Sequence, residues 1–351
     1  MIRLWWLRCP AVLVLLPLLA LRPVLDAYPD AAQSLYRNGL FELYRTVWDA
    51  LFGWADHTAL ILFFLVGMAF WIRAGIRKRT RLRLSTWWVL PNTLGALGVW
   101  FLTTWGFNYN CPTLADQNGW SDQSLKAVHL EQLVGKSLSQ LEYLHTQALP
   151  NGLDTTVSTT PWLPALRTSQ RQYLAQAGFS GTGKVNVISV RPEGMLHRLS
   201  IGGIYLPFSG QGHVDAASHP VSRLFTAAHE MSHGYGVTDE GEANTTAFFT
   251  LVHASESELQ YAGWMQLLRH ALGALKRQDP ASAVALRDAF PCWLEQELIT
   301  IRRWQRKHRP AFPQFSEAIN DFYLKQQGMQ AGVASYSDFL SHIHQSWQQK
   351  P

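Results

Sequence analysis

The chain has 351 residues, which is enough for one domain and a further segment. Its formal net charge of +5 arises near the N-terminus, because residues 1–83 hold eleven Lys and Arg against five Asp and Glu. The rest of the chain carries a net charge of −1, which excludes the basic footprint of a nucleic-acid-binding domain. Three cysteines are too few for a disulfide-rich scaffold or a cysteine zinc cluster.

Three hydrophobic segments are predicted to cross a membrane, and together they form a membrane region over residues 1–108. They lie at about 4–24, 52–72 and 86–107. The first follows Arg3 and Arg8 and is typical of either a signal peptide or a signal anchor. The alternative is that the segments are buried core helices, but tryptophans flank them as they do at membrane interfaces. The flanking residues are Trp5, Trp6, Trp71, Trp87, Trp88 and Trp105.

The charges of the loops predict the orientation of these segments. The loop after the second segment is basic and holds no acid; its charged residues are Arg73, Arg77, Lys78, Arg79, Arg81 and Arg83. The loop before the second segment is acidic. By the positive-inside rule the basic loop lies in the cytoplasm, so we expect a multi-pass protein of the cytoplasmic (inner) membrane. Residues 109–351 are then expected to lie on the extracytoplasmic side.

Residues 109–351 are predicted to form an α-rich α+β domain. Asp122–Leu149 and Trp162–Ala177 carry apolar residues near helical spacing. The run Gly178–Lys184 has the spacing of a phosphate-binding loop, but Val185 stands where a Ser or Thr would hold magnesium. We therefore interpret this run as a plain turn.

Val185–Val190 and Leu199–Phe208 are predicted to pair as a β-hairpin across the turn Arg191–Gly194. Pro207 suits an edge strand, where its missing N–H costs little. In zinc peptidases an edge strand beside the active-site helix binds the substrate backbone by strand addition. The residues predicted for this role are Gly203, Ile204, Tyr205 and Leu206. The alternative is a hairpin that only covers the helix.

The sequence Ala227-Ala-His-Glu-Met-Ser-His-Gly-Tyr-Gly236 holds the strongest chemical signal. On a helix, His229 and His233 lie on one face, one turn apart, with Glu230 beside them. This is the H-E-x-x-H arrangement of zinc hydrolases, in which the glutamate is the general base. A pair of core histidines is the alternative, but unpaired polar groups on a buried helix cost several kcal/mol.

A catalytic zinc site needs a third protein ligand, and two carboxylates compete for that role. The glycines after His233 allow the chain to turn back, so Glu242 can reach the metal from the first turn of the next helix. Asp239-x-x-Glu242 is also a capping-box pattern, which would assign Glu242 to the helix start instead. Glu240 is the rival ligand.

Further helices complete the predicted domain. They are expected at Ala243–His253, Glu256–Leu275, Val284–Lys307 with a break at Pro291, Phe315–Gln327 and Tyr336–Gln349. Cys111 and Cys292 both fall on the extracytoplasmic side, where disulfides persist, so a Cys111–Cys292 bridge is expected. Two small buried side chains are the alternative.

Several of these motifs together resemble an uncharacterised family of bacterial membrane proteins, a domain of unknown function to which a metallopeptidase site is attributed. The residues that carry the resemblance are Trp105–Tyr109, Gly203–Phe208, the H-E-x-x-H and Glu242-Ala-Asn244. The site is also similar to that of ImmA/IrrE-type gluzincin peptidases, in which the Glu of Glu-Ala-Asn is the third zinc ligand. That similarity implies a zincin-like fold and assigns the role to Glu242. The chain departs from the family at Gln211, where an acidic residue is usual.

The sequence therefore predicts a membrane-anchored zinc metallopeptidase that cleaves a peptide or protein substrate. Zn²⁺ would be held by His229, His233 and Glu242, and Glu230 would activate the bound water. Further hydrogen-bond donors to the transition state are expected among His213, His219, Tyr205 and Tyr235. The alternative is a non-catalytic zinc-binding membrane scaffold or sensor.

Overall fold

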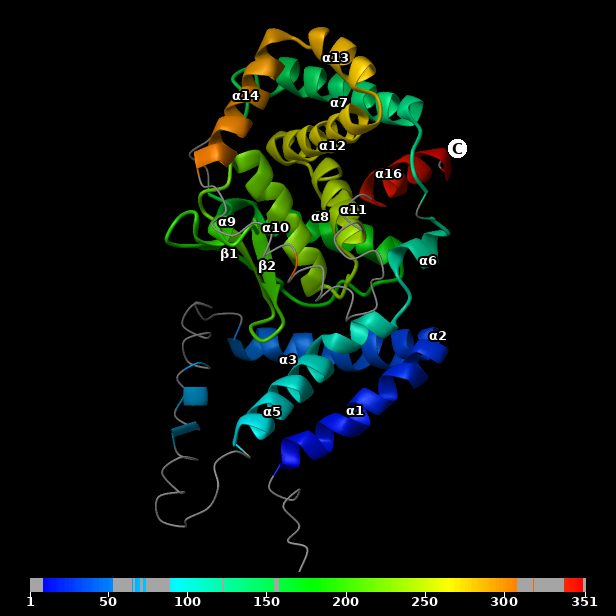
Figure 1. Cartoon of the computed structure of the whole chain (residues 1–351), viewed down its shortest axis with the longest axis vertical. Helices are drawn as coiled ribbons and strands as arrows, with labels where there is room; N and C mark the ends of the chain where they lie inside the picture. The colour runs from blue at the N-terminus through cyan, green and yellow to red at the C-terminus, as the bar shows by residue number, and fades with distance from the viewer. Residues whose placement is uncertain are drawn as a thin grey trace, which may run out of the picture. The chain divides into compact units, whose positions relative to one another are not determined.

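The computed structural model describes residues 9–52, 65, 67–69, 72–73, 89–121, 123–154, 158–307, 318 and 338–349 (Figure 1). These residues form two compact units. The first contains residues 9–112 together with the short segments Thr182–Lys184 and Leu206–Gly210, and the second contains the rest. Most of the chain is helical.

The first unit is built from helices. They are α1 (Pro10–Ala27), α2 (Pro29–Ala32), the π-helix η2 (Gln33–Phe41), α3 (Glu42–Phe52), α5 (Val89–Thr104) and the 3₁₀ helix η3 (Gly106–Asn110). Of the described residues, α1 is the one helix long and apolar enough to cross a membrane, with 18 residues and a mean hydropathy of 1.8. A signal sequence has the same character. The predicted second segment and the basic loop after it lie almost wholly outside the described residues.

Helices α1 and α5 approach each other closely because α5 presents glycines at the contact. A Cβ on Gly95 would lie 2.9 Å from the Val12 nitrogen, and one on Gly98 would lie 3.0 Å from the Leu15 side chain. Small residues of this kind let apolar helices pack backbone to backbone. The Asn92 Oδ1 accepts a 2.9 Å hydrogen bond from the Ala11 N–H, one of the amides that a helix start leaves unpaired. This bond explains an asparagine within the third predicted apolar segment.

A buried arginine on α3 holds the segment Leu206–Gly210 within the first unit. Arg45 Nη1 donates to the Gly210 carbonyl at 2.7 Å, and Nη2 pairs with Asp49 at 3.1 Å. The neighbouring Trp48 Nε1 donates to the Ser209 carbonyl at 3.0 Å. Gly210 has φ +67°, and a side chain there would also run into the guanidinium.

The second unit is an α-rich domain with one small sheet. Its elements are α6 (Leu114–Asn118), α7 (Ala127–Gln147), η4 (Thr160–Trp162), α8 (Leu163–Gln176), β1 (Val187–Val190), α9 (Met195–Arg198), β2 (Gly203–Leu206), β3 (Gln211–Asp215), α10 (Pro220–Gly234), α11 (Glu240–Val252), α12 (Ser257–Gln278), α13 (Pro280–Asp288), α14 (Cys292–Lys307) and α16 (Asp338–Gln349). Figure 1 shows α10 between the sheet and α11, with α12 and α7 beyond them. The predicted helices are confirmed here, including the break at Pro291, except that Phe315–Gln327 lies outside the described residues apart from residue 318.

The sheet differs from the predicted hairpin. Its strand order is β1-β3-β2, and β1 pairs in parallel with β3, with Val187 opposite Gly212 and Val190 opposite Asp215. β3 therefore lies between the two strands that were expected to pair, and the second of these is shorter than predicted. The four-residue connection from β2 to β3 requires an antiparallel turn. β3 is fully buried, yet its sequence Gln-Gly-His-Val-Asp lacks the alternation that indicates a strand.

The predicted Cys111–Cys292 disulfide is not formed, and both thiols are free. Cys111 is buried beside η3, where its Sγ lies 3.5 Å from the Phe107 carbonyl. Burial raises the pKa of the Cys111 thiol, and the nearby Arg37 only partly opposes that effect. Cys292 is exposed at the start of α14. Cys111 thus behaves as the small buried side chain of the alternative interpretation.

Candidate metal centre

Helix α10 carries the H-E-x-x-H residues, and it is buried except at Ser222, Arg223 and Thr226, which are half-buried. Pro220 begins it, because proline suits the first turn of a helix. It ends at Gly234, and Gly236 then takes φ +91°, a left-handed conformation that turns the chain away. A Cβ on Gly234 would lie 2.4 Å from Val185 Cγ1, so this glycine also sets how closely the helix packs on the chain before β1.

His229 and His233 direct their Nε2 atoms toward the same place. Their Nε2 atoms are 3.2 Å apart. The Nδ1 of His229 lies 2.9 Å from Asn244 Oδ1, and the Nδ1 of His233 lies 2.8 Å from the Val237 carbonyl. Both partners are acceptors, so each Nδ1 carries the proton in a neutral ring. The Nε2 lone pairs are then left to bind a metal, as in metal-binding histidines generally.

Glu240 completes the group. Its Oε2 lies 3.1 Å from the His229 Nε2 and 3.6 Å from the His233 Nε2. The three donor atoms all lie within 4.8 Å of one another, and His229, His233 and Glu240 form the one such group found among the described residues. Two imidazoles and a carboxylate are a donor set that suits zinc and leaves a fourth position for water.

The structure places Glu240, and not the predicted Glu242, beside the two histidines. Glu242 Oε1 accepts a 2.7 Å hydrogen bond from the Ala115 N–H of α6, and its own N–H donates to Asp239 Oδ1 at 2.8 Å. Helix α11 begins at Glu240, and two residues later the helix has turned by about 200°. Glu240 therefore faces the histidines while Glu242 faces α6. The Asp239 cap that competed with the ligand interpretation is formed.

Glu230 lies under β2, with little exposure to solvent. A Cβ on Gly203 would come within 2.6 Å of Glu230 Oε1, and a Cβ on Gly212 would come within 2.7 Å of Glu230 Cβ. Burial raises the pKa of Glu230 to about 7, although the two histidines and the Tyr205 backbone N–H favour its charged form. Its side chain is thus poised to gain or lose a proton near neutral pH.

His233 and Glu240 stabilise each other's charged forms. Burial lowers the pKa of His233, but the Glu240 carboxylate outweighs that effect and raises it to about 9. Burial acts on Glu240 in the opposite sense, and the two histidines still depress its pKa far below the usual range. At neutral pH the pair is therefore an imidazolium and a carboxylate. A metal ion that binds here takes the place of the His233 proton.

The predicted substrate strand lies beside the site. β2 is an outer strand of the described sheet, as Pro207 indicated. Gly203 faces Glu230, and the Tyr205 ring lies 6.5 Å from the His233 ring. Because side chains alternate along a strand, Ile204 and Leu206 point to the other face.

The predicted transition-state donors are placed differently from one another. Gly212 faces α10, so its neighbour His213 points to the opposite face of the sheet. His219 is the N-cap of α10, ten residues or about 15 Å along the helix from His229. The structure therefore does not bring these two histidines to the site, and their roles stay predictions. Tyr235 caps the other end of α10 and is buried in the core. Its role stays a prediction.

Asn244 orients the His229 ring, a role that was not predicted from the sequence. Asn244 lies four residues after Glu240 on α11, so both side chains face α10. That spacing was the signal that could have identified Glu240 as the ligand and Asn244 as the residue that orients His229.

Comparisons with known proteins identify a family for this chain but no activity. A family model with the description "Protein of unknown function (DUF3810)" matches residues 36–343. No curated protein and no solved structure matches the chain.

The corrected ligand assignment predicts which carboxylate holds the metal. Glu240→Ala removes a donor and should lower zinc affinity by more than the about 10–100-fold typical of changes to residues that only orient a ligand. Asn244→Ala should fall within that range. Glu242→Ala is the matched control on the same helix and should keep its zinc. Zinc content by mass spectrometry after dialysis checks this, and loss of zinc from Glu242→Ala alone would reverse the assignment.

The raised pKa of His233 predicts a pH-dependent zinc affinity. Below about pH 9 a proton must leave His233 before zinc binds, so affinity should rise by up to about tenfold per pH unit from pH 7 and level off above pH 9. In the metal-free protein the same proton stabilises the fold below pH 6.5, and this stabilisation is lost as the pH rises through about 9. Chelator competition across this range measures the affinity, and Glu230→Gln controls for the proton on Glu230. An affinity independent of pH would contradict the prediction.

Proposed function

Since the chain belongs to the DUF3810 family, whose description names no activity, we propose from the site itself that the protein is a membrane-anchored zinc metallopeptidase. One observation carries the proposal. The imidazoles of His229 and His233 are held by their Nδ1 atoms, so that both Nε2 atoms converge on Glu240, and Glu230 lies next to them on α10. Metal ligands together with a separate buried acid are the parts that hydrolysis requires.

Zinc bound at this site would act as a Lewis acid and lower the pKa of a coordinated water. Glu230 would take a proton from the water whose oxygen attacks the scissile carbonyl carbon, and would pass it to the leaving amine as the C–N bond breaks. A general base works best when its pKa lies near the working pH, and burial raises the pKa of Glu230 toward that range. The Tyr205 N–H donates a hydrogen bond to the carboxylate, and Gly203 leaves the space that the carboxylate occupies.

β2 supplies the means of binding a peptide. It is an outer strand, and it runs past Glu230 and His233. A peptide in extended conformation would lie along it with its scissile carbonyl toward the metal.

The apolar N-terminal helices support a membrane location. α1 has the length and hydropathy of a span, and it packs on the apolar helix α5 through glycines. We propose three spans, with residues 109–351 outside the cytoplasm, because the basic loop Arg73–Arg83 obeys the positive-inside rule only in that orientation.

A single substitution should separate the role of the general base from the role of the metal ligands. Glu230→Gln keeps every metal ligand and a similar shape but cannot accept a proton. It should retain zinc and lose peptide cleavage by about 10²–10⁴-fold or more. Zinc content and cleavage of a peptide library by the purified full-length protein measure both effects. Cleavage at the parent rate would overturn the peptidase mechanism, whereas zinc binding without cleavage by the parent protein would indicate a scaffold or sensor.

Reporter fusions test the orientation. A phosphatase that is active only outside the cytoplasm should be active when fused after Pro351 and inactive when inserted in the loop Arg77–Arg83. A fluorescent protein that matures only in the cytoplasm should give the opposite pattern. Phosphatase activity from the loop and none from the C-terminus would place the domain in the cytoplasm instead.

A further inference from the structure

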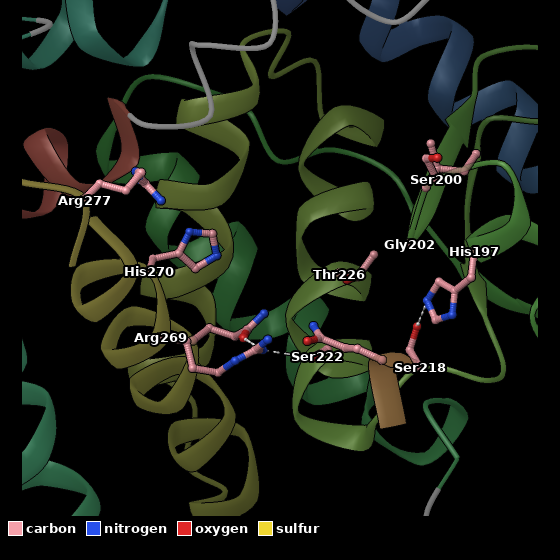
Figure 2. A pocket seen from close by; sticks show the side chains of 13 residues that line it. His197, Ser200, Gly202, Ser218, Ser222, Thr226, Arg269, His270 and Arg277 are labelled. Carbon is pink, nitrogen blue, oxygen red and sulfur yellow. Dashed lines mark hydrogen bonds between the residues drawn. The ribbon is translucent and has the colours of Figure 1, made fainter. Parts of the chain in front are cut away.

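A cavity of about 570 Å³ opens beside the metal centre, within the second unit (Figure 2). Figure 2 shows Arg269, His270 and Arg277 of α12 on one side, His197 and Gly202 on the other, and Ser222 and Thr226 of α10 between them. The described residues that line it include two arginines and two histidines and no aspartate or glutamate. The cavity is therefore basic and open to solvent, in a domain whose net charge is close to zero.

Arg269 is held in place by neutral groups. Its Nη1 donates to Ser222 Oγ at 3.1 Å and to Gln266 Oε1. Burial lowers the pKa of Arg269 to about 10, and the charge of Arg302 lowers it further, with no carboxylate acting on it in the opposite sense. Arg302 itself pairs with Glu295. A partly buried cation without an acid costs free energy, which an anionic ligand can recover.

The cavity and the metal centre share one face of α10. Ser222, Thr226 and Glu230 are four residues apart, so they lie in a row along the helix. The Ser222 end, where the Arg269 guanidinium lies, is about 12 Å from Glu230. Gly203 of β2 packs on the row between them, because a Cβ there would come within 2.6 Å of both Thr226 and Glu230. On the other wall, His270 is close enough to His229 for their charges to interact.

We propose that this cavity is a specificity pocket for a carboxylate of the substrate. The proposal rests on the proposed peptidase function and names the class of peptide that it cleaves. An extended peptide advances about 3.3 Å per residue, so a carboxylate that reaches Arg269 belongs to a residue within about three positions of the cleaved bond. Arg269 forms a charge-assisted bond to it, and Arg277 adds a second positive charge at the mouth. The carboxylate comes from a Glu or Asp side chain or from the C-terminus of the peptide.

Matched peptides test the pocket. Each member of the set carries one Glu within three residues of the bond, and its partner carries Gln at the same position. Every peptide is made with a free and with an amidated C-terminus. The purified zinc-loaded full-length protein should cleave the Glu peptides with a kcat/KM about 10–100-fold above their Gln partners at one or two positions. Glu and Gln partners that are cleaved equally, and that both lose a similar factor on amidation, would identify the C-terminal carboxylate as the ligand.

Variants then assign the preference to the pocket. Arg269→Gln should bring the Glu to Gln ratio close to one, and Arg277→Gln should reduce it by a smaller factor. Arg303→Gln, an exposed position on α14 outside the pocket, should leave it unchanged. Arg277→Gln also guards against a fold that does not tolerate loss of Arg269, because Arg277 is exposed at the end of α12. Equal cleavage of Glu and Gln peptides by the parent protein, with no loss on amidation, would overturn the pocket and leave the peptidase intact.

Binding separates this proposal from the peptidase itself. The zinc-loaded Glu230→Gln variant keeps the pocket and should bind fluorescent Glu peptides more tightly than Gln peptides by fluorescence anisotropy. The double variant Glu230→Gln with Arg269→Gln should lose that difference. If these binding results hold but no peptide is cleaved by the parent protein, the pocket stands and the hydrolytic function fails. Equal binding of Glu and Gln peptides by the Glu230→Gln variant, unchanged by amidation of the C-terminus, would overturn the pocket.

Discussion

The close approach of α10 to the sheet is the constraint on which the site depends. Gly203 and Gly212 stand where any side chain would collide with Glu230, and Gly234 stands where one would collide with Val185. Without these glycines the helix would have to move away from the strands. Glu230 would then lose the backbone N–H of Tyr205, and water would reach it more freely. Packing thus sets the environment that raises the Glu230 pKa, so the geometry of the helix and the chemistry of the acid have one cause.

The charges of the metal centre follow from this burial. Four ionisable side chains meet in a site that excludes most solvent, and they balance one another through proximity: Glu240 keeps His233 protonated, and the histidines keep Glu240 ionised. Such a group is costly to bury unless each charge is paired. The proton on His233 balances the negative charge of Glu240, and a bound divalent cation would balance it more strongly.

The site and the basic cavity extend along the same helix face, and this continuity supports a common function. Ser222 and Thr226 line the cavity, and His229 and Glu230 lie on the next turn. A ligand that occupied both would be elongated and would carry a negative group some distance from the reacting bond. A peptide with a carboxylate fits that description.

The sequence by itself determined the parts whose signal is local. The four-residue spacing of His229 and His233 needs only a helix, and the apolar periodicity of α7, α8 and α12 is visible in any window of the chain. The tertiary structure decided what depends on distant partners. β3 is a strand because it is buried between β1 and β2, although its own residues are polar or small. Glu240 rather than Glu242 lies beside the histidines because α11 begins at residue 240. The Glu242 carboxylate instead accepts a hydrogen bond from the N–H of Ala115, which is far away in the sequence. Spacing along a chain restricts which residues can meet, but only packing fixes the direction in which each side chain points.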